Sequence, residues 1–227
     1  MDAAQGPQMA ASPATRRLGL WSAAAALACS LAYDIAQVCE WLGWLGSSGG
    51  PNASSTAFGL VLLLTPSLLL GSAFVCLLSA LYQAAPRDRR AFTLAALALG
   101  VVYATLTGMV YFVQLTFVGP RIAAGDTQGI ELLLFVPYRS FLFAVDLLGY
   151  GMMCLACMLA ALGLPRERPF LALRRALLAN GALAPFLLLQ MTWPVLIWPA
   201  ALWAIVFPLA MYLAMRLFSR LPQSEVA

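Results

Sequence analysis

Six long apolar stretches dominate the pattern of this chain, and short polar connections separate them. A helix needs about 20 predominantly apolar residues to cross a bilayer, and each stretch reaches that length. The pattern therefore predicts an all-α fold: a polytopic membrane helix bundle of six transmembrane helices that occupies residues 18–219. The predicted spans are approximately 18–45, 57–85, 91–118, 131–163, 170–191 and 194–218.

Arginine residues gather in alternate connections between these stretches. The chain has 13 basic residues and no His, and every basic residue is Arg. Cytoplasmic loops of membrane proteins collect Arg and Lys, so the alternation predicts the direction of each crossing. We expect both termini to be cytoplasmic, in a protein of the cell (cytoplasmic or inner) membrane. The residues concerned are Arg16, Arg17, Arg87, Arg89, Arg90, Arg166, Arg168, Arg174, Arg175, Arg216 and Arg220.

Polar tails flank the spans. Residues 1–17 have the composition of a disordered tail, and residues 220–227 form a short tail at the other terminus. Under the predicted topology both tails lie in the cytoplasm. The apolar and aromatic pattern continues to Leu45 without a convincing cleavage site, so we expect the first span to be retained rather than removed as a signal.

Composition supports a membrane location and excludes several classes of chemistry. The chain is 63% apolar and 10% charged, whereas soluble domains have about 45–50% apolar and about 25% charged residues. The net charge of +4 lies in juxtamembrane loops, where it meets lipid headgroups, so we expect lipid as a partner and no nucleic acid. Because the chain has no His or Lys, it cannot form a His-ligated metal site, a catalytic Ser-His pair or a Schiff base on lysine. The sequence predicts no catalytic residue, metal site or cofactor and favours a non-enzymatic role.

The five Cys residues give no clear chemistry. Cys154 and Cys157 have the C-x-x-C spacing of a redox pair. Their apolar surroundings raise the pKa of a thiol and favour buried packing residues over a redox centre.

Four ionisable residues interrupt the apolar stretches: Asp34, Glu40, Arg139 and Asp146. A charged side chain at the centre of a membrane helix costs about 2.5–3.5 kcal/mol on insertion scales. These side chains are therefore expected to face the interior of the bundle. We predict that Arg139 pairs with Asp34 or Glu40.

Helical spacing places further polar side chains beside these charges. At about 100° per residue, the first span carries one polar arc, the third span another, and the fourth span a charged face. Most of these groups fall in the half of the bundle away from the Arg-rich loops, which predicts an outward-facing polar cavity. Pro137 indicates that the segment before it is a short outer or re-entrant piece. The candidate ligand- or ion-binding residues are Tyr33, Asp34, Gln37, Glu40, Tyr111, Gln114, Tyr138, Arg139 and Asp146.

Three functions are compatible with this pattern. The leading hypothesis is binding or transport of a small polar or amphipathic solute, coupled to protons through a carboxylate. A second hypothesis is a non-catalytic assembly or accessory subunit with a protein partner in the membrane. The third is an intramembrane enzyme that uses paired carboxylates on a lipid-like substrate. A buried ion pair that only sets helix register is the structural alternative to all three.

Overall fold

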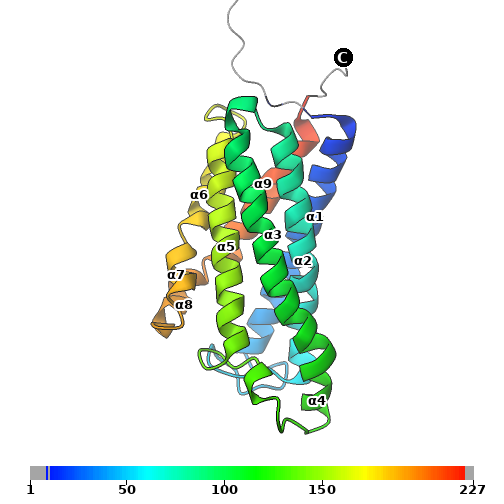
Figure 1. Ribbon diagram of the computed structural model, residues 1–227, viewed down its shortest axis with the longest axis vertical. Coiled ribbons are helices and arrows are strands. Elements are labelled where there is room, and N and C mark those ends of the chain that lie inside the picture. Colours follow the sequence, from blue (N-terminus) through cyan, green and yellow to red (C-terminus); the bar gives the residue numbers. More distant parts are fainter. Residues whose placement is uncertain (1–8, 10, 223–227) are drawn as a thin grey trace, which may run out of the picture.

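The computed structural model describes Met9 and residues 11–222, which form an elongated bundle of helices (Figure 1). Six helices are long and apolar enough to span a membrane, so the predicted all-α fold with six membrane-spanning helices is confirmed. Most of both predicted tails lies outside the described residues. In the described part of the first tail, Ser12 caps a helix that already begins at Pro13.

Three spans are single or nearly continuous helices, and three are composite. The first, second and fourth spans are α1 (Pro13–Trp41), α2 (Ala57–Ala84) and α5 (Phe141–Gly163). The third consists of η1 (Arg87–Arg89), α3 (Arg90–Val113), the π-helical η2 (Gln114–Val118) and α4 (Gly119–Ala123). The fifth consists of α6 (Leu171–Gly181) and α7 (Ala184–Leu188), and the sixth of η4 (Pro194–Leu196), α8 (Ile197–Ala200) and α9 (Trp203–Arg220).

Two helix boundaries that flank the loop at residues 124–140 differ from the predicted spans. The third span runs on to Ala123 instead of ending at 118, because η2 carries the helix through Gly119 and Pro120 fits the first turn of α4. The fourth span begins at Phe141 instead of 131. Ser140 caps it by accepting a hydrogen bond from the Phe143 N–H at 3.2 Å. The segment before it contains the short η3 (Glu131–Leu133) and turns.

The six spans form a closed ring. Each packs on two neighbours in the order α1, α2, α3, α5, α6, α9 and back to α1. Small residues allow close approach at the seams. A Cβ at Gly149 of α5 would lie 2.6 Å from Thr107 of α3, and one at Gly19 of α1 would lie 2.5 Å from the Phe218 ring of α9. Such contacts are typical of helix packing in membranes.

Arginine side chains close one end of this ring. At this end α2, α5 and α9 finish, and their last carbonyls lack partners within the helix. An Arg near the start of a neighbouring helix reaches each set of carbonyls and complements the negative end of the helix dipole. Arg16 bonds to Phe218 O (3.0 Å) and Ser219 O (2.7 Å), Arg90 to Ala85 O (3.2 Å) and Gln83 O (3.3 Å), Arg174 to Ala161 O (2.6 Å) and Leu164 O (3.1 Å), and Arg89 to Leu164 O (2.7 Å).

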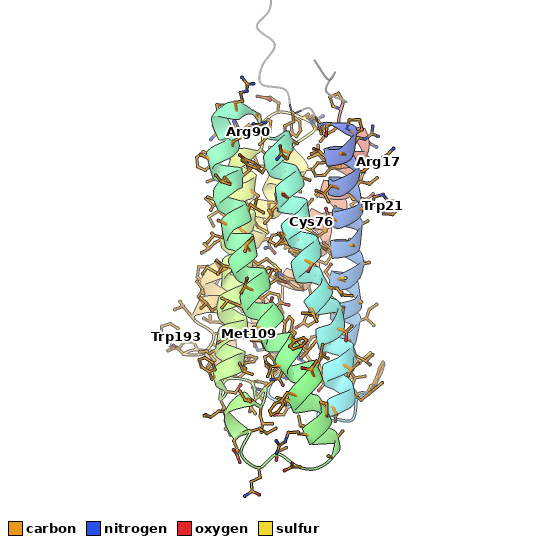
Figure 2. The ribbon with its side chains drawn as sticks, turned by 45° about the vertical axis from the view of Figure 1, so that its right-hand side comes forward. Arg17, Trp21, Cys76, Arg90, Met109 and Trp193 are labelled. Carbon is orange, nitrogen blue, oxygen red and sulfur yellow. The ribbon has the colours of Figure 1, made fainter. Side chains whose placement is uncertain are left out.

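Both ends of the described chain lie at this Arg-rich end, where the Ala11 N–H donates to Pro222 O at 3.3 Å. Figure 2 shows Arg17 and Arg90 at this end, with Cys76 and Met109 along the outside of the bundle. Many large apolar side chains are exposed along its length. A membrane-embedded surface of this kind contacts lipid.

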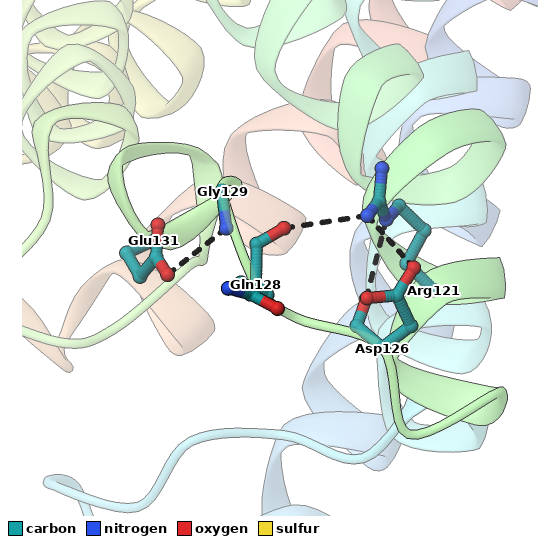
Figure 3. A network of polar contacts seen from close by, with 5 residues as sticks. All are labelled: Arg121, Asp126, Gln128, Gly129 and Glu131. Carbon is teal, nitrogen blue, oxygen red and sulfur yellow. Dashed lines mark hydrogen bonds and ion pairs between the residues drawn. The ribbon is translucent and has the colours of Figure 1, made fainter.

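A separate polar network orders the loop at the opposite end (Figure 3). Arg121 pairs with Asp126 at 2.8 Å and also donates to Gln128 O at 3.3 Å. The N–H groups of Glu131 and Gly129 hydrogen-bond the Glu131 carboxylate and lower its pKa. The network ties α4 to η3 and neutralises the charge of Arg121 within the loop.

We expect Arg174→Gln to lower the free energy of unfolding by about 1–3 kcal/mol, because two buried carbonyls lose a charged donor. Arg175→Gln on the next, exposed position removes the same charge and should stay within about 0.5 kcal/mol of the wild type. Denaturant unfolding in detergent micelles, followed by circular dichroism, measures both. Equal losses for the two variants would contradict the capping role.

Candidate functional site

A closed cycle of five aromatic side chains, the aromatic cycle, fills the centre of the bundle. Neighbouring ring centroids are 5.0–5.8 Å apart, the spacing of favourable aromatic pairs. The side chains come from four of the six spans, and all five are buried. In order around the cycle they are Phe74 of α2, Tyr103 of α3, Tyr150 of α5, Trp203 of α9 and Phe207 of α9, which returns to Phe74.

Polar side chains attach to the aromatic cycle. The Tyr33 ring lies 5.8 Å from Trp203, and its hydroxyl donates to Gln37 Oε1 at 2.9 Å. Tyr111 donates a hydrogen bond to the Tyr150 hydroxyl at 3.2 Å. Three of the predicted candidates, from α1 and α3, thus meet at the centre of the bundle.

Asp146 is the acidic member of this group. It precedes Tyr150 by one helical turn and lies about 7–8 Å inside the start of α5. Its carboxylate is within electrostatic reach of the hydroxyls of Tyr33, Tyr103 and Tyr111. Asp146 is only 8% exposed. Its Oδ1 has no hydrogen-bond partner among the described residues.

The two acidic residues of α1 lie elsewhere. Asp34 is half-buried, and neither of its carboxylate oxygens has a hydrogen-bond partner in the described part of the chain. Glu40 is 3% exposed and lies against the first turn of α2, where a Cβ on Gly59 would approach its Oε2 to 2.8 Å. The positive end of the α2 dipole favours a carboxylate at this place.

The predicted pairing of Arg139 with Asp34 or Glu40 is wrong. Across residues 11–222, the ion pairs are Arg89–Asp88 and Arg121–Asp126. Because α5 begins only at Phe141, Arg139 sits in an exposed turn outside the apolar helix. It can be hydrated there and needs no buried counter-ion.

Gln114 and Tyr138 hold the segment before α5 over the end of the bundle. The Gln114 side chain in η2 is buried and donates to Leu133 O at 2.6 Å. Tyr138 adopts a left-handed backbone conformation (φ 61°), which is strained for a bulky residue. Its ring packs 5.2 Å from that of Phe143. These two candidates therefore position a loop that covers this end.

Two cavities of the described structure lie away from the predicted polar cavity. One, of 790 Å³, lies at the Arg-rich end. The other, of 310 Å³, lies between α2 and the η2–α4 region and includes Gln114. Neither is lined by Asp34 or Asp146. The aromatic rings of the central group are buried and in contact in this conformation, so a bound solute would require the helices to open.

The aromatic cycle was not predicted as a site. Tyr103 and Tyr111 share the polar arc of the third span, and Tyr150 follows Asp146 by one turn. Helical spacing therefore indicated that these three tyrosines face the interior. Phe74 and Phe207 cannot be told from lipid-facing residues by sequence, because the rotation of each helix in the ring decides which apolar side chains meet.

Other chemistry is limited in the described part of the chain. Residues 11–222 contain no group of three or more His, Cys, Asp or Glu side chains placed to hold a metal. Cys154 and Cys157 are buried and have free thiols. Comparison of the chain with protein-family models, with curated proteins and with solved structures finds no match.

Trp203 is the side chain on which this arrangement depends most, since it contacts three aromatic rings and donates to Met153 Sδ at 3.4 Å. We expect Trp203→Ala to lower the free energy of unfolding by about 3–5 kcal/mol. Trp193→Ala, at a position that is 54% exposed, should change it by less than about 0.5 kcal/mol. Unfolding in detergent, followed by circular dichroism, compares them. A small effect of Trp203→Ala would show that the centre is loosely packed.

Proposed function

We propose that this multi-pass membrane protein binds and transports a small amphipathic cation in exchange for protons, at Asp146 and the aromatic cycle. The observation that carries the proposal is the buried Asp146 carboxylate beside aromatic rings and without a counter-ion in the described structure. The protein is a membrane protein with six spanning helices. The nature of its solute is inferred from the chemistry of this site.

The charge balance favours a cation. The chain has no Lys or His. Arg139 and Arg121 lie at one end, and the remaining Arg residues lie at the Arg-rich end. A carboxylate in an apolar interior is costly unless it is neutralised by a proton or a cation. Asp146 therefore attracts positive charge and rejects anions.

The surrounding side chains suit an organic cation. Tyr and Trp rings attract cations through their faces, most strongly where water is excluded. Tyr150 lies one helical turn from Asp146 and packs on Trp203, and Tyr33 and Tyr111 add hydroxyl groups. Apolar groups of the solute would be held by the rings, and its charge by the carboxylate.

Breaks in two spans offer a means of opening the site. The fifth span is interrupted between α6 and α7, and the sixth between α8 and α9. Figure 1 shows that the α7–α8 hairpin turns back before the level of α4. Trp203 is the first residue of α9, directly after the second break. Discontinuous helices of this kind border the binding sites of many secondary transporters.

Proton coupling follows from competition for one carboxylate. A solute cation can bind only when Asp146 is ionised, and a proton displaces it. We expect the affinity for tetraphenylphosphonium, a lipophilic test cation, to rise with pH, because protons compete for the carboxylate at low pH. Isothermal titration calorimetry on protein in detergent measures this dependence.

Asp146→Asn should lower that affinity by at least about tenfold and remove its pH dependence, because the amide carries no charge. Asp146→Glu should retain both properties in part. Asp126→Asn, in the exposed loop of Figure 3, is the matched control and should behave as the wild type. Unchanged binding by a folded Asp146→Asn variant would refute the proposed site.

We propose that the protein lies in the cytoplasmic (inner) membrane. Its Arg-rich end faces the cytoplasm, as the distribution of Arg favours. Asp146 and the Tyr138 loop would then lie toward the outside. A green fluorescent protein fused to the C-terminus should be fluorescent, and alkaline phosphatase fused there should be inactive. The reverse pattern would overturn this orientation.

A further inference from the structure

The 790 Å³ groove at the Arg-rich end, the α6–α9 groove, combines two kinds of surface. It lies between the start of α6 and the last turns of α9. Arg168, Arg216 and Arg220 line it, together with apolar side chains of both helices. It is at the end of the bundle away from Asp146 and is independent of the proposed transport site.

The arginines of this groove differ from those that close the helix ends. Arg16 and Arg174 are engaged by backbone carbonyls. In the described residues, Arg168, Arg216 and Arg220 are exposed and their guanidinium groups have neither a hydrogen bond nor an ion pair. Arg216 only stacks on the Tyr212 ring, at 5.8 Å. These guanidinium groups are available to an external anion.

The groove carries an excess of positive charge. Glu167 is its one acidic lining residue in the described chain, so three Arg against one Glu leave a net charge of +2. The first turn of α6, at Leu171, adds backbone N–H groups that no side chain caps. A helix N-terminus of this kind favours a phosphate group.

The apolar part of the groove indicates that the anion carries a hydrocarbon chain. Phe170, Leu173, Leu213 and Leu217 line the groove. A soluble phosphate makes no apolar contacts with these side chains. A zwitterionic lipid has no net charge that the net positive charge of the groove could attract. Basic pockets between membrane helices at the headgroup level are typical sites for anionic phospholipids.

From these features we propose that the α6–α9 groove binds one anionic glycerophospholipid, with its phosphate at Arg168, Arg216 and Arg220 and an acyl chain against Phe170, Leu173, Leu213 and Leu217. The lipid ties the end of α9 to the start of α6. It thereby anchors the two helices whose spans are interrupted further along.

Titration of the full-length protein in detergent with phosphatidylglycerol or phosphatidylcholine, followed by native mass spectrometry, tests the proposal. We expect one phosphatidylglycerol to remain bound, with an affinity at least about tenfold above that for phosphatidylcholine. A parallel titration with glycerol phosphate tests whether a phosphate headgroup without acyl chains is sufficient for binding. It should bind at least about tenfold more weakly than the lipid.

Variants separate the two parts of the site. The triple variant Arg168→Gln, Arg216→Gln, Arg220→Gln should lose at least about tenfold in affinity for phosphatidylglycerol. Arg17→Gln combined with Arg175→Gln removes exposed charges at the same end but outside the groove, and should retain binding. Ala172→Trp fills the groove without changing its charge and should also weaken binding. Circular dichroism verifies that each variant is folded.

Three results would each overturn the proposal: equal affinity for phosphatidylglycerol and phosphatidylcholine, equal affinity for glycerol phosphate and phosphatidylglycerol, or equal losses of affinity in the groove and control variants. The first would indicate a nonspecific lipid surface, the second a site for a soluble anion, and the third a general charge effect. A folded triple variant with unchanged lipid affinity would also overturn it.

Discussion

The last carbonyls of a helix have no partners within the helix, and this constraint organises the Arg-rich end of the bundle. Three helices finish there with carbonyls that need donors, and three others start there. Arg16, Arg90 and Arg174 each reach from a starting helix to the last carbonyls of a neighbour. One residue type thus supplies charge at the membrane surface, caps for helix ends and links between successive members of the ring.

The same end shows that arginines in such loops do not share one role. A guanidinium that lies under the helix ends donates its hydrogen bonds to backbone carbonyls, as Arg174 does. Where it lies beside an apolar groove, as with Arg216, it faces outward and can meet a headgroup. Removing a capping arginine and removing a groove arginine are therefore different physical changes, although both subtract one positive charge.

The guanidinium groups and the buried carboxylate of Asp146 are separated along the bundle. Guanidinium groups stay at the ends, whereas Asp146 lies in the packed interior beside tyrosine hydroxyls. In a medium of low dielectric constant, an unpaired carboxylate has a strong preference for a proton or a cation. The proposed site for an amphipathic cation and the proposed site for an anionic lipid are consistent with this separation, since each carries the charge opposite to its ligand.

The sequence by itself determined the number of spans and the grouping of arginines at alternate connections, because apolar length and the position of charges are local properties of the chain. It also indicated that the side chains of Tyr33, Gln37, Tyr111 and Asp146 face the interior of the bundle, since a polar group inside a span is costly against lipid. Only the tertiary structure decided their partners. The start of α5 at Phe141, capped by Ser140, removed Arg139 from the interior. The rotation of the helices brought Phe74 against Tyr103, and Phe207 against Phe74 and Trp203. Such contacts depend on how separate helices face one another, which the local period of a sequence does not specify.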